Sequence, residues 1–498
     1  MENRQYGHSV PGTSLVAESP EPRRPRRRPR WVRWTLVTAA AGSTAAGAVL
    51  ILMPAQERHR VLPPAPAPRP AAGPRTQALT TVTAGVPAAL PDLAALIARQ
   101  ERTVQAQPHN ARAWAVLGTA YVEQGRQSAD TADYPKAERA LRAALEVQDL
   151  RDADRAAALG GMAALANARR DFPQAKEYGE QLMELTPKQW TAYPPLIDAY
   201  TGLGDYKNAR STLDKLMGLK TDAATRPAVM ARASAVYRDR GWREDAVAQL
   251  TDAASAARTP AEQAACLTGL GQLAWERGDL SDALRHFEAA GRLDPGQRAA
   301  AAGQGRTLAA MGRTSQALAA YQAASGKQPD PRYALELGEL YESLGMNRDA
   351  ERQYDVLRER AQVAEAGGVD EDLLLGQLEA DHGDPQEAVL QLEDEWRRQP
   401  GIEVADALGW ALHRAGDDEE ALTYAETATD KTKGGGVRSA LYVFHRGIIE
   451  RELDQDSSAR RHLKEALQIN PYFSPLQAPA ARSALRELGD VPDEPVPQ

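Results

Sequence analysis

The chain has 498 residues, of which 43% are hydrophobic and only 5% are aromatic, and its formal net charge at neutral pH is −8. A net negative charge disfavours a general nucleic-acid binder, which needs a basic surface. The single cysteine, Cys266, excludes an intramolecular disulfide, and we expect it to be a small buried residue rather than a nucleophile.

The N-terminal part of the sequence predicts a membrane anchor. Residues 1–30 are rich in arginine and proline and predict a disordered tail. The twenty residues 34–53 carry no charge, and a helix of that length spans about 30 Å, enough to cross a bilayer. We therefore expect a single transmembrane signal anchor over residues 31–53. Arg30 and Arg33 precede it, so the tail is predicted to be cytoplasmic and the remainder extracytoplasmic.

A cleaved signal peptide is the alternative interpretation of the same stretch, because a basic region before an apolar run suits both. Cleavage needs small residues soon after the apolar run, and Met53-Pro54-Ala55 is a poor site. The uncleaved anchor in the cell membrane is therefore favoured over secretion. Residues 54–90 are rich in proline and alanine and predict an extended linker.

A repeating pattern occupies residues 108–473, and it is best seen in Ala264–Pro295. Two amphipathic segments flank the break at Gly278-Asp279, which predicts a helix–turn–helix unit. The alanine of the second segment recurs at steps of 33 to 38 residues, at Ala137, Ala175, Ala209, Ala246, Ala283, Ala317, Ala350, Ala388, Ala421 and Ala459. Single helices are expected at residues 91–107 and 474–489, where they would cap the array, and residues 490–498 predict a disordered tail.

This pattern resembles the tetratricopeptide repeat family, whose consensus runs W-x2-L-G-x2-Y, then A-x3-F, then P over 34 residues. Leu270-Gly271, Ala283, Phe287 and Pro295 carry the match in the unit above. The resemblance implies an all-α fold: an α-solenoid, a right-handed superhelix of about ten repeats, here preceded by one transmembrane helix. Each repeat is expected to pack mainly against its neighbours. The scarcity of lysine beside arginine and the abundance of alanine resemble the usage of a high-GC actinobacterium.

Neither a catalytic nor a cofactor site is predicted. The sequence has no phosphate-binding P-loop, no HExxH pair and no CxxC motif, so we expect no cofactor, no metal, no small-molecule substrate and no enzymatic activity. Asp381-His382 at a predicted turn lacks the further ligands that a metal site needs.

The resemblance instead implies a concave surface, lined by the first helix of each repeat, that holds a protein or peptide. Aligning the repeats gives a groove that runs from basic to acidic to aromatic side chains. Its acidic part includes Glu336, Glu339, Glu342, Asp370 and Asp381. The candidate partner-binding residues are Arg232, Arg238, Trp275, Arg306, Trp410, His413, Phe444, His445, Ile448 and Arg451.

Two alternatives stay open for these residues. The charged side chains can form an ordinary solvated helix face, and the aromatic side chains can pack in the interface between neighbouring repeats. For the whole chain, we expect a membrane-anchored scaffold that binds a protein or peptide. A permanent structural subunit of an envelope or transport complex is the second hypothesis, and an enzyme with an unrecognised site is the third.

Overall fold

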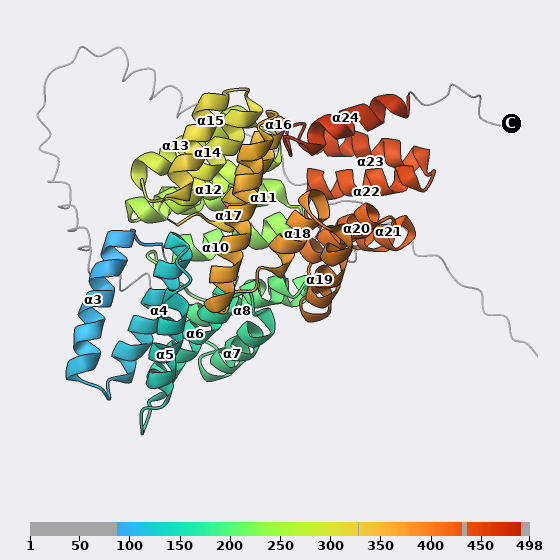
Figure 1. The fold of residues 1–498 in the computed structure, drawn as a ribbon. Coiled ribbons are helices and arrows are strands. Elements are labelled where there is room, and N and C mark those ends of the chain that lie inside the picture. The colour runs from blue at the N-terminus through green and yellow to red at the C-terminus, as the bar shows by residue number, and fades with distance from the viewer. Residues whose placement is uncertain (1–86, 327, 431–435, 490–498) are drawn as a thin grey trace, which may run out of the picture. The chain divides into compact units, whose positions relative to one another are not determined.

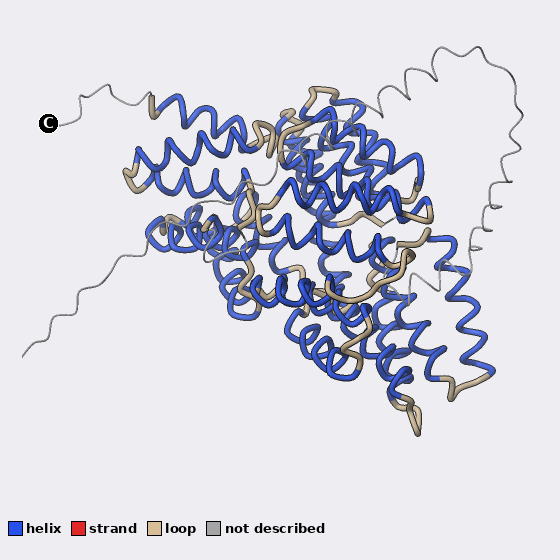
Figure 2. Tube along the Cα trace, turned by 180° about the vertical axis from the view of Figure 1, so that it is seen from behind, coloured by secondary structure: helices blue, strands red, loops and turns tan. Residues whose placement is uncertain are grey.

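The structure is a computed structural model that describes residues 87–326, 328–430 and 436–489. Within these ranges the chain forms 22 α-helices and one 3-10 helix, and Figure 2 shows only helices and loops there. Successive helices pack as hairpin pairs in chain order (Figure 1). The predicted all-α repeat architecture is thus confirmed for the described part of the chain.

Ten helix pairs make up the array. Their first helices are α4 (Ala111–Ser128), α6 (Asp152–Ala168), α8 (Tyr193–Gly202), α10 (Arg226–Asp239), α12 (Pro260–Glu276), α14 (Arg298–Ala310), α16 (Pro331–Ser343), α18 (Asp372–His382), α20 (Ile402–Ala415) and α22 (Ala440–Glu452). Their second helices are α5 (Asp133–Leu145), α7 (Phe172–Leu185), α9 (Tyr206–Met217), α11 (Arg243–Ala256), α13 (Leu280–Leu293), α15 (Thr314–Ser325), α17 (Asn347–Ala366), α19 (Pro385–Arg398), α21 (Asp418–Thr429) and α23 (Asp456–Ile469). We number the pairs one to ten in this order.

Single helices flank the array: α3 (Leu90–Ala106) packs on α4, and α24 (Gln477–Glu487) packs on α23. The 3-10 helix η1 (Trp190–Ala192) leads into α8. None of the described helices is long and apolar enough to cross a bilayer. The predicted anchor at residues 31–53, both predicted tails and the linker as far as residue 86 lie outside the described residues.

The core is a row of small-to-large contacts between the two helices of each pair. All ten register alanines of the second helices are buried, at 0–2% exposure. On the first helices, glycines let a bulky side chain of the second helix reach the backbone. A Cβ atom on Gly271 would lie 2.7 Å from the ring of Phe287, and one on Gly376 would lie 2.5 Å from Leu392. The predicted burial of Cys266 is confirmed, at 4% exposure.

The array also makes contacts between pairs that are far apart in sequence. The backbone oxygen of Gly367 accepts from Arg169 Nε at 2.9 Å across 198 residues, and Ile402 N donates to the Tyr206 hydroxyl at 3.2 Å across 196. Asn470 Nδ2 donates to the carbonyl of Trp275 at 2.8 Å across 195 residues. The expectation that each repeat packs mainly against its neighbours is therefore incomplete.

In pairs two to five these contacts follow one rule: the turn inside a pair touches the loop that follows the pair five places later. We call this line of contacts the seam. It joins turns 169–171, 203–205, 240–242 and 277–279 to residues 367–370, 399–401, 436–438 and 470–471. The turn of pair one instead contacts Arg360 and Val363 of α17. Glycines with positive φ make the approach close, since a Cβ on Gly278 would lie 2.9 Å from Pro471.

Candidate functional site

Charged side chains link the first helices of pairs three to seven into what we call the charge ladder. Arg232 of α10 pairs with Asp198 of α8. Arg238, one helical turn and a half further along α10, reaches Glu276 of α12 at 2.7 Å. The ladder is completed by Gln272 of α12, which contacts Arg306 of α14 at 3.4 Å, and by Glu336 of α16, also 3.4 Å from Arg306.

The ladder lies in partly exposed but strongly desolvated surroundings. The side chain of Asp198 is 37% exposed, and yet burial raises the pKa of its carboxyl despite the neighbouring Arg232. Burial likewise raises the pKa of Asp239 to about 6, although Arg238 opposes it. Desolvation of a side chain that solvent still reaches is typical of an enclosed recess. The charged side chains of the ladder therefore lie on a partly exposed face of the first helices, where charge interactions are strong.

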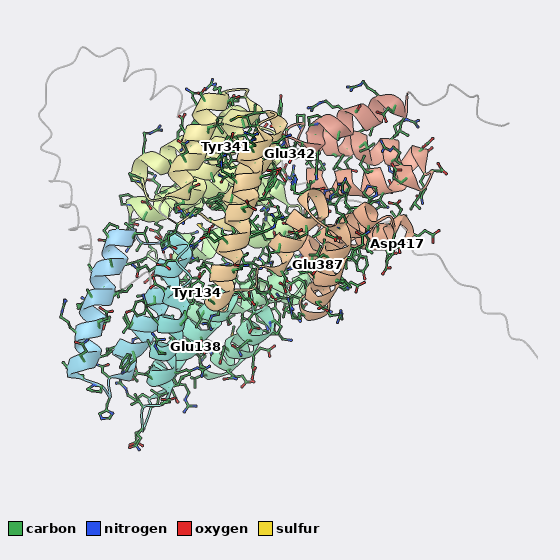
Figure 3. The ribbon with its side chains drawn as sticks, in the orientation of Figure 1. Tyr134, Glu138, Tyr341, Glu342, Glu387 and Asp417 are labelled. Carbon is green, nitrogen blue, oxygen red and sulfur yellow. The ribbon has the colours of Figure 1, made fainter. Side chains whose placement is uncertain are left out.

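An acidic patch adjoins the end of the ladder. It consists of Glu336, Glu339 and Glu342, spaced three apart on one face of α16, and Asp381 of α18. Three of these carboxylates have donors. Tyr321 donates to Glu336 at 2.9 Å, Tyr354 to Glu342 at 2.8 Å, and Trp410 Nε1 to Asp381 at 2.9 Å. Figure 3 labels Glu342 at the end of α16.

Glu339 differs from the other members of the patch because no described residue pairs or hydrogen-bonds with its side chain. Burial, together with the charges of Asp381, Glu336 and Glu342, raises the pKa of Glu339 to about 8. The carboxyl is thus largely protonated at neutral pH. A cation brought beside it would favour the ionised form, so this patch is suited to receive a lysine or arginine side chain.

Replacing Glu339 by Gln should flatten the dependence of stability on pH. The pKa of Glu339 is higher in the folded chain than the ordinary value near 4.5, so its stabilising contribution is present at acid pH and is lost as pH rises to about 8. The variant should equal the wild type near pH 5 and exceed it at pH 9 by on the order of 2 kcal/mol. Urea unfolding of both proteins across that pH range measures the difference in stability. Glu359→Gln, at an exposed position of α17, is the control. Parallel pH profiles of wild type and Glu339→Gln would contradict the assignment.

The predicted aromatic end of the groove is packed, which agrees with the alternative that these side chains lie between repeats and not with partner binding. Trp410 is 8% exposed, Phe444 is 2% and Ile448 is 7%. The Trp410 ring stacks on His445 at 4.2 Å between centroids, and His445 Nδ1 lies 3.0 Å from Asp406. These side chains fill the interface between pairs nine and ten, because the first helices α20 and α22 approach each other there.

The three other predicted residues also have internal partners. His413 Nδ1 lies 2.5 Å from Asp418, and Arg451 lies 2.7 Å from Glu452. Trp275 is 7% exposed, and the guanidinium of Arg306 lies over its ring at 5.6 Å from the centroid. The structure thus brings Arg232, Arg238, Trp275 and Arg306 together along the ladder. It groups His413, Phe444, His445 and Ile448 with Trp410, whereas Arg451 pairs with Glu452 and Glu487.

A second acidic cluster, Asp370, Asp372 and Glu395, has an internal cation. Their oxygens lie within 4.8 Å of one another, as in a metal site. Arg398 Nη2 sits 2.9 Å, 2.6 Å and 2.7 Å from the three carboxylates. This cluster was not predicted from the sequence, since Asp370 lies in the loop before α18 and Arg398 lies 28 residues later, at the end of α19. Asp370 therefore belongs to this cluster and not to the acidic patch.

Comparison with known proteins bears on the repeats. Residues 274–335 match the family model described as tetratricopeptide repeat. No curated protein matches the chain.

Among solved structures, a human IFIT1 dimer with PPP-AAAA is 18% identical, covers 64% of this chain and 72% of its own, and has a TM-score of 0.42. A tetratricopeptide repeat protein from Parabacteroides merdae is 18% identical, covers 54% of this chain and 100% of its own, with a TM-score of 0.32. Pseudomonas aeruginosa pilF is 19% identical, covers 43% and 97%, and scores 0.34.

None of these values supports transferring a ligand or partner to this chain. The family match and the recurrence of the same helix pair rest on different observations, one on residues 274–335 and the other on ten buried alanines. The described part of the chain is therefore an all-helical repeat array, and its residues 274–335 are similar to tetratricopeptide repeats.

Proposed function

We propose that the chain is a membrane-anchored, non-enzymatic scaffold whose first helices bind an extended segment of a partner protein outside the cytoplasm. Tetratricopeptide repeats generally bind proteins or peptides, and the charge ladder and acidic patch supply polar side chains along one inner face. The observation that carries the proposal is Glu339, a desolvated carboxyl without a partner among the described residues. Such a group favours a segment that carries lysine or arginine.

The same patch disfavours a nucleic-acid ligand. The oligonucleotide-like ligand PPP-AAAA belongs to the human IFIT1 structure, and phosphates need cationic contacts. Here the arginines of the ladder already have acidic partners, namely Asp198, Glu276 and Glu336. A protein segment is the better match to this surface.

Glu339→Lys should abolish capture of the partner from membrane extract by the full-length chain, because it places a cation where the partner's cation would bind. Glu359→Lys makes the same substitution on the exposed face of α17 and should leave capture unchanged. Mass spectrometry of the captured proteins measures both. Identical sets from wild type and Glu339→Lys would overturn the proposed site.

Washing the captured complex with concentrated salt distinguishes the two scaffold hypotheses. Reversible binding through surface charge weakens as salt screens it, so the partner should be released. A permanent structural subunit should instead stay bound in constant stoichiometry, since an obligate interface buries a large apolar area. Release supports the scaffold, and retention supports the structural subunit.

The membrane topology is a separate prediction. A reporter that is active only in the cytoplasm should be inactive when fused after Pro91 or after Gln498, because the arginines precede the single apolar stretch. Fusion before residue 30 should give full activity and serves as the control. Activity at Pro91 and Gln498 would refute the predicted orientation.

A further inference from the structure

The seam uses the turns of the early pairs and the loops of the late pairs. It leaves turns of the late pairs and loops of the early pairs without a partner among the described residues. Turns of pairs three to five receive a loop, and a Cβ on Gly204, Gly241 or Gly278 would collide with it. The equivalent glycines of pairs six, seven and nine, Gly312, Gly345 and Gly416, have nothing within 4 Å of a Cβ position among the described residues. Conversely, the loops that precede the first pairs have no seam contact in the described chain.

The free turn of pair seven is apolar. Leu344 and Met346 flank Gly345 and are 41% and 40% exposed, and they are two of the seven large hydrophobic residues exposed in the described chain. The corresponding positions of the occupied turn in pair five are Arg277 and Asp279. Apolar side chains gathered on an exposed turn commonly mark an interaction surface. This turn has the conformation of the seam turns, with a positive φ at its glycine.

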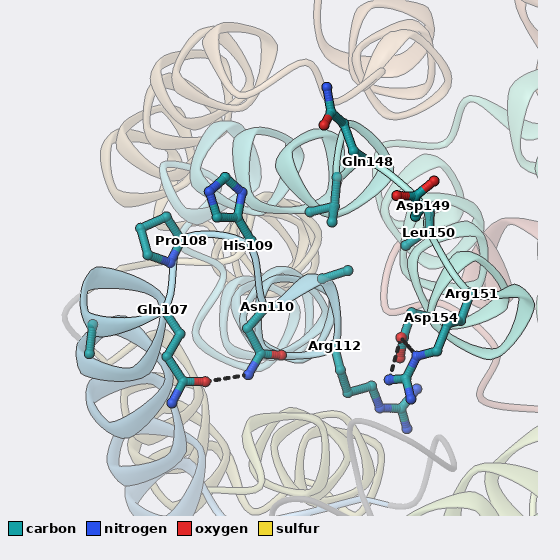
Figure 4. Close-up of a pocket in the computed structure, with 13 residues that line it drawn as sticks. Gln107, Pro108, His109, Asn110, Arg112, Gln148, Asp149, Leu150, Arg151 and Asp154 are labelled. Atoms are coloured by element: carbon teal, nitrogen blue, oxygen red, sulfur yellow. Dashed lines mark hydrogen bonds and ion pairs between the residues drawn. The ribbon is translucent and has the colours of Figure 1, made fainter.

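The free loops carry a matching recess. An open pocket of ≈ 700 Å³ lies between the loop from α3 to α4 and the loop from α5 to α6. Figure 4 shows it lined by Pro108, His109, Asn110, Gln148, Asp149 and Leu150. These loops hold the same place in their pairs as the seam loops that receive a turn.

Charge complements the fit of turn and recess. Arg313 and Arg348 are exposed beside the free turns of pairs six and seven, and neither forms an ion pair with a described residue. Asp149 lines the recess and Asp152 lies beside it, and both are exposed and likewise unpaired. The recess also holds Arg151, which pairs with Asp154 at 2.6 Å, and Arg112, which forms no ion pair with a described residue. The turn edge is thus apolar and basic, and Asp149 is the acidic group of the recess that can receive a cation from it.

We propose that two copies of this chain associate head to tail, with turn 344–346 of one copy docked in the recess between residues 106–112 and 147–154 of the next. The occupant is a second copy because the two edges are the two sides of an interface that each chain already forms internally. The seam joins turns to loops at four successive pairs, two to five, and a second copy continues the same pattern past pair five. Such a contact is heterologous, so it leaves one turn edge and one recess free for further copies.

The test mixes two differently tagged pools of the purified full-length chain in detergent and measures co-capture. Wild-type pools should capture each other. The double variant Leu344→Glu with Met346→Glu removes the apolar surface of the turn. The double variant Gln148→Arg with Asp149→Asn changes the charge of the recess. Asn is chosen at position 149 because it tolerates the left-handed backbone there. All four positions are exposed, so folding should be kept, and circular dichroism checks it.

Each double variant should capture itself about tenfold less than wild type does, equivalent to ~1.4 kcal/mol. A mixture of the two variants should recover capture, because one supplies an intact turn and the other an intact recess. Leu390→Glu, at a position 64% exposed on α19, is the matched control and should behave as wild type.

Three outcomes would overturn the proposal. Wild-type pools that do not capture each other would show that the turn binds another protein or another segment of the chain. Undiminished self-capture of either variant would place the contact elsewhere. Failure of the mixed variants, when each is folded, would indicate a symmetric contact. Loss of partner capture by Glu339→Lys is independent of all three, since that residue lies on the inner face.

Discussion

Replacing Trp410 by Ala should lower the free energy of unfolding by ~3–5 kcal/mol. The side chain is 8% exposed, and its ring centroid lies 4.2 Å from that of His445 and 5.9 Å from that of Phe444. Truncation leaves a cavity between pairs nine and ten, and it removes the 2.9 Å hydrogen bond from Trp410 Nε1 to Asp381. Chemical denaturation of the full-length chain measures the loss.

Leu390→Ala is the control, because that side chain is 64% exposed and its removal should change stability by less than ~0.5 kcal/mol. If Trp410→Ala captured less partner but were about as stable as the wild type, Trp410 would have the binding role that the sequence suggested. A side chain that packs between pairs nine and ten should instead show a large loss of stability on replacement, while the folded protein still captures its partner.

The alanine register shows why the fold was predictable. Ala283 and its nine counterparts face the first helix of their own pair, and that contact depends on a local pattern of small and large residues. Gly271 against Phe287 is a contact within one pair, separated by 16 residues, so the sequence places both partners in register. Repetition then multiplies the signal along the chain.

The site was harder to predict because a first helix has several neighbours. The same spacing that points Arg306 towards the ladder points Trp410 towards the next pair, where it is buried. The pattern of one sequence cannot separate a face that solvent reaches from a face that the next helix covers. The seam was beyond prediction for a different reason. It depends on the small rotation between successive pairs, summed over five of them, which no local motif encodes.

Gly271→Leu should destabilise the array by ~1–3 kcal/mol, because the new side chain has no room. Even a Cβ at this position would lie 2.7 Å from the Phe287 ring, and Phe287 is 2% exposed and cannot move outward. Hydrogen exchange measured by mass spectrometry should show loss of protection in α12 and α13 and in the adjoining pairs. Gly291→Leu is the matched control, since its nearest neighbour is the flexible end of Gln304 at 3.2 Å.

The seam predicts a second region of lost protection. The turn that ends α12 accepts a hydrogen bond from Asn470 at 2.8 Å and lies against Pro471, so distortion of α12 should loosen residues 470–476 and α24. A helix between these regions, such as α19, should keep its protection because it packs on α18 and α20 instead. Loss confined to pairs four to six would show that the seam transmits little energy. Uniform loss of protection from residue 87 to residue 489 would mean that the array unfolds as one unit. That result would contradict coupling limited to neighbouring pairs and coupling through the seam alike.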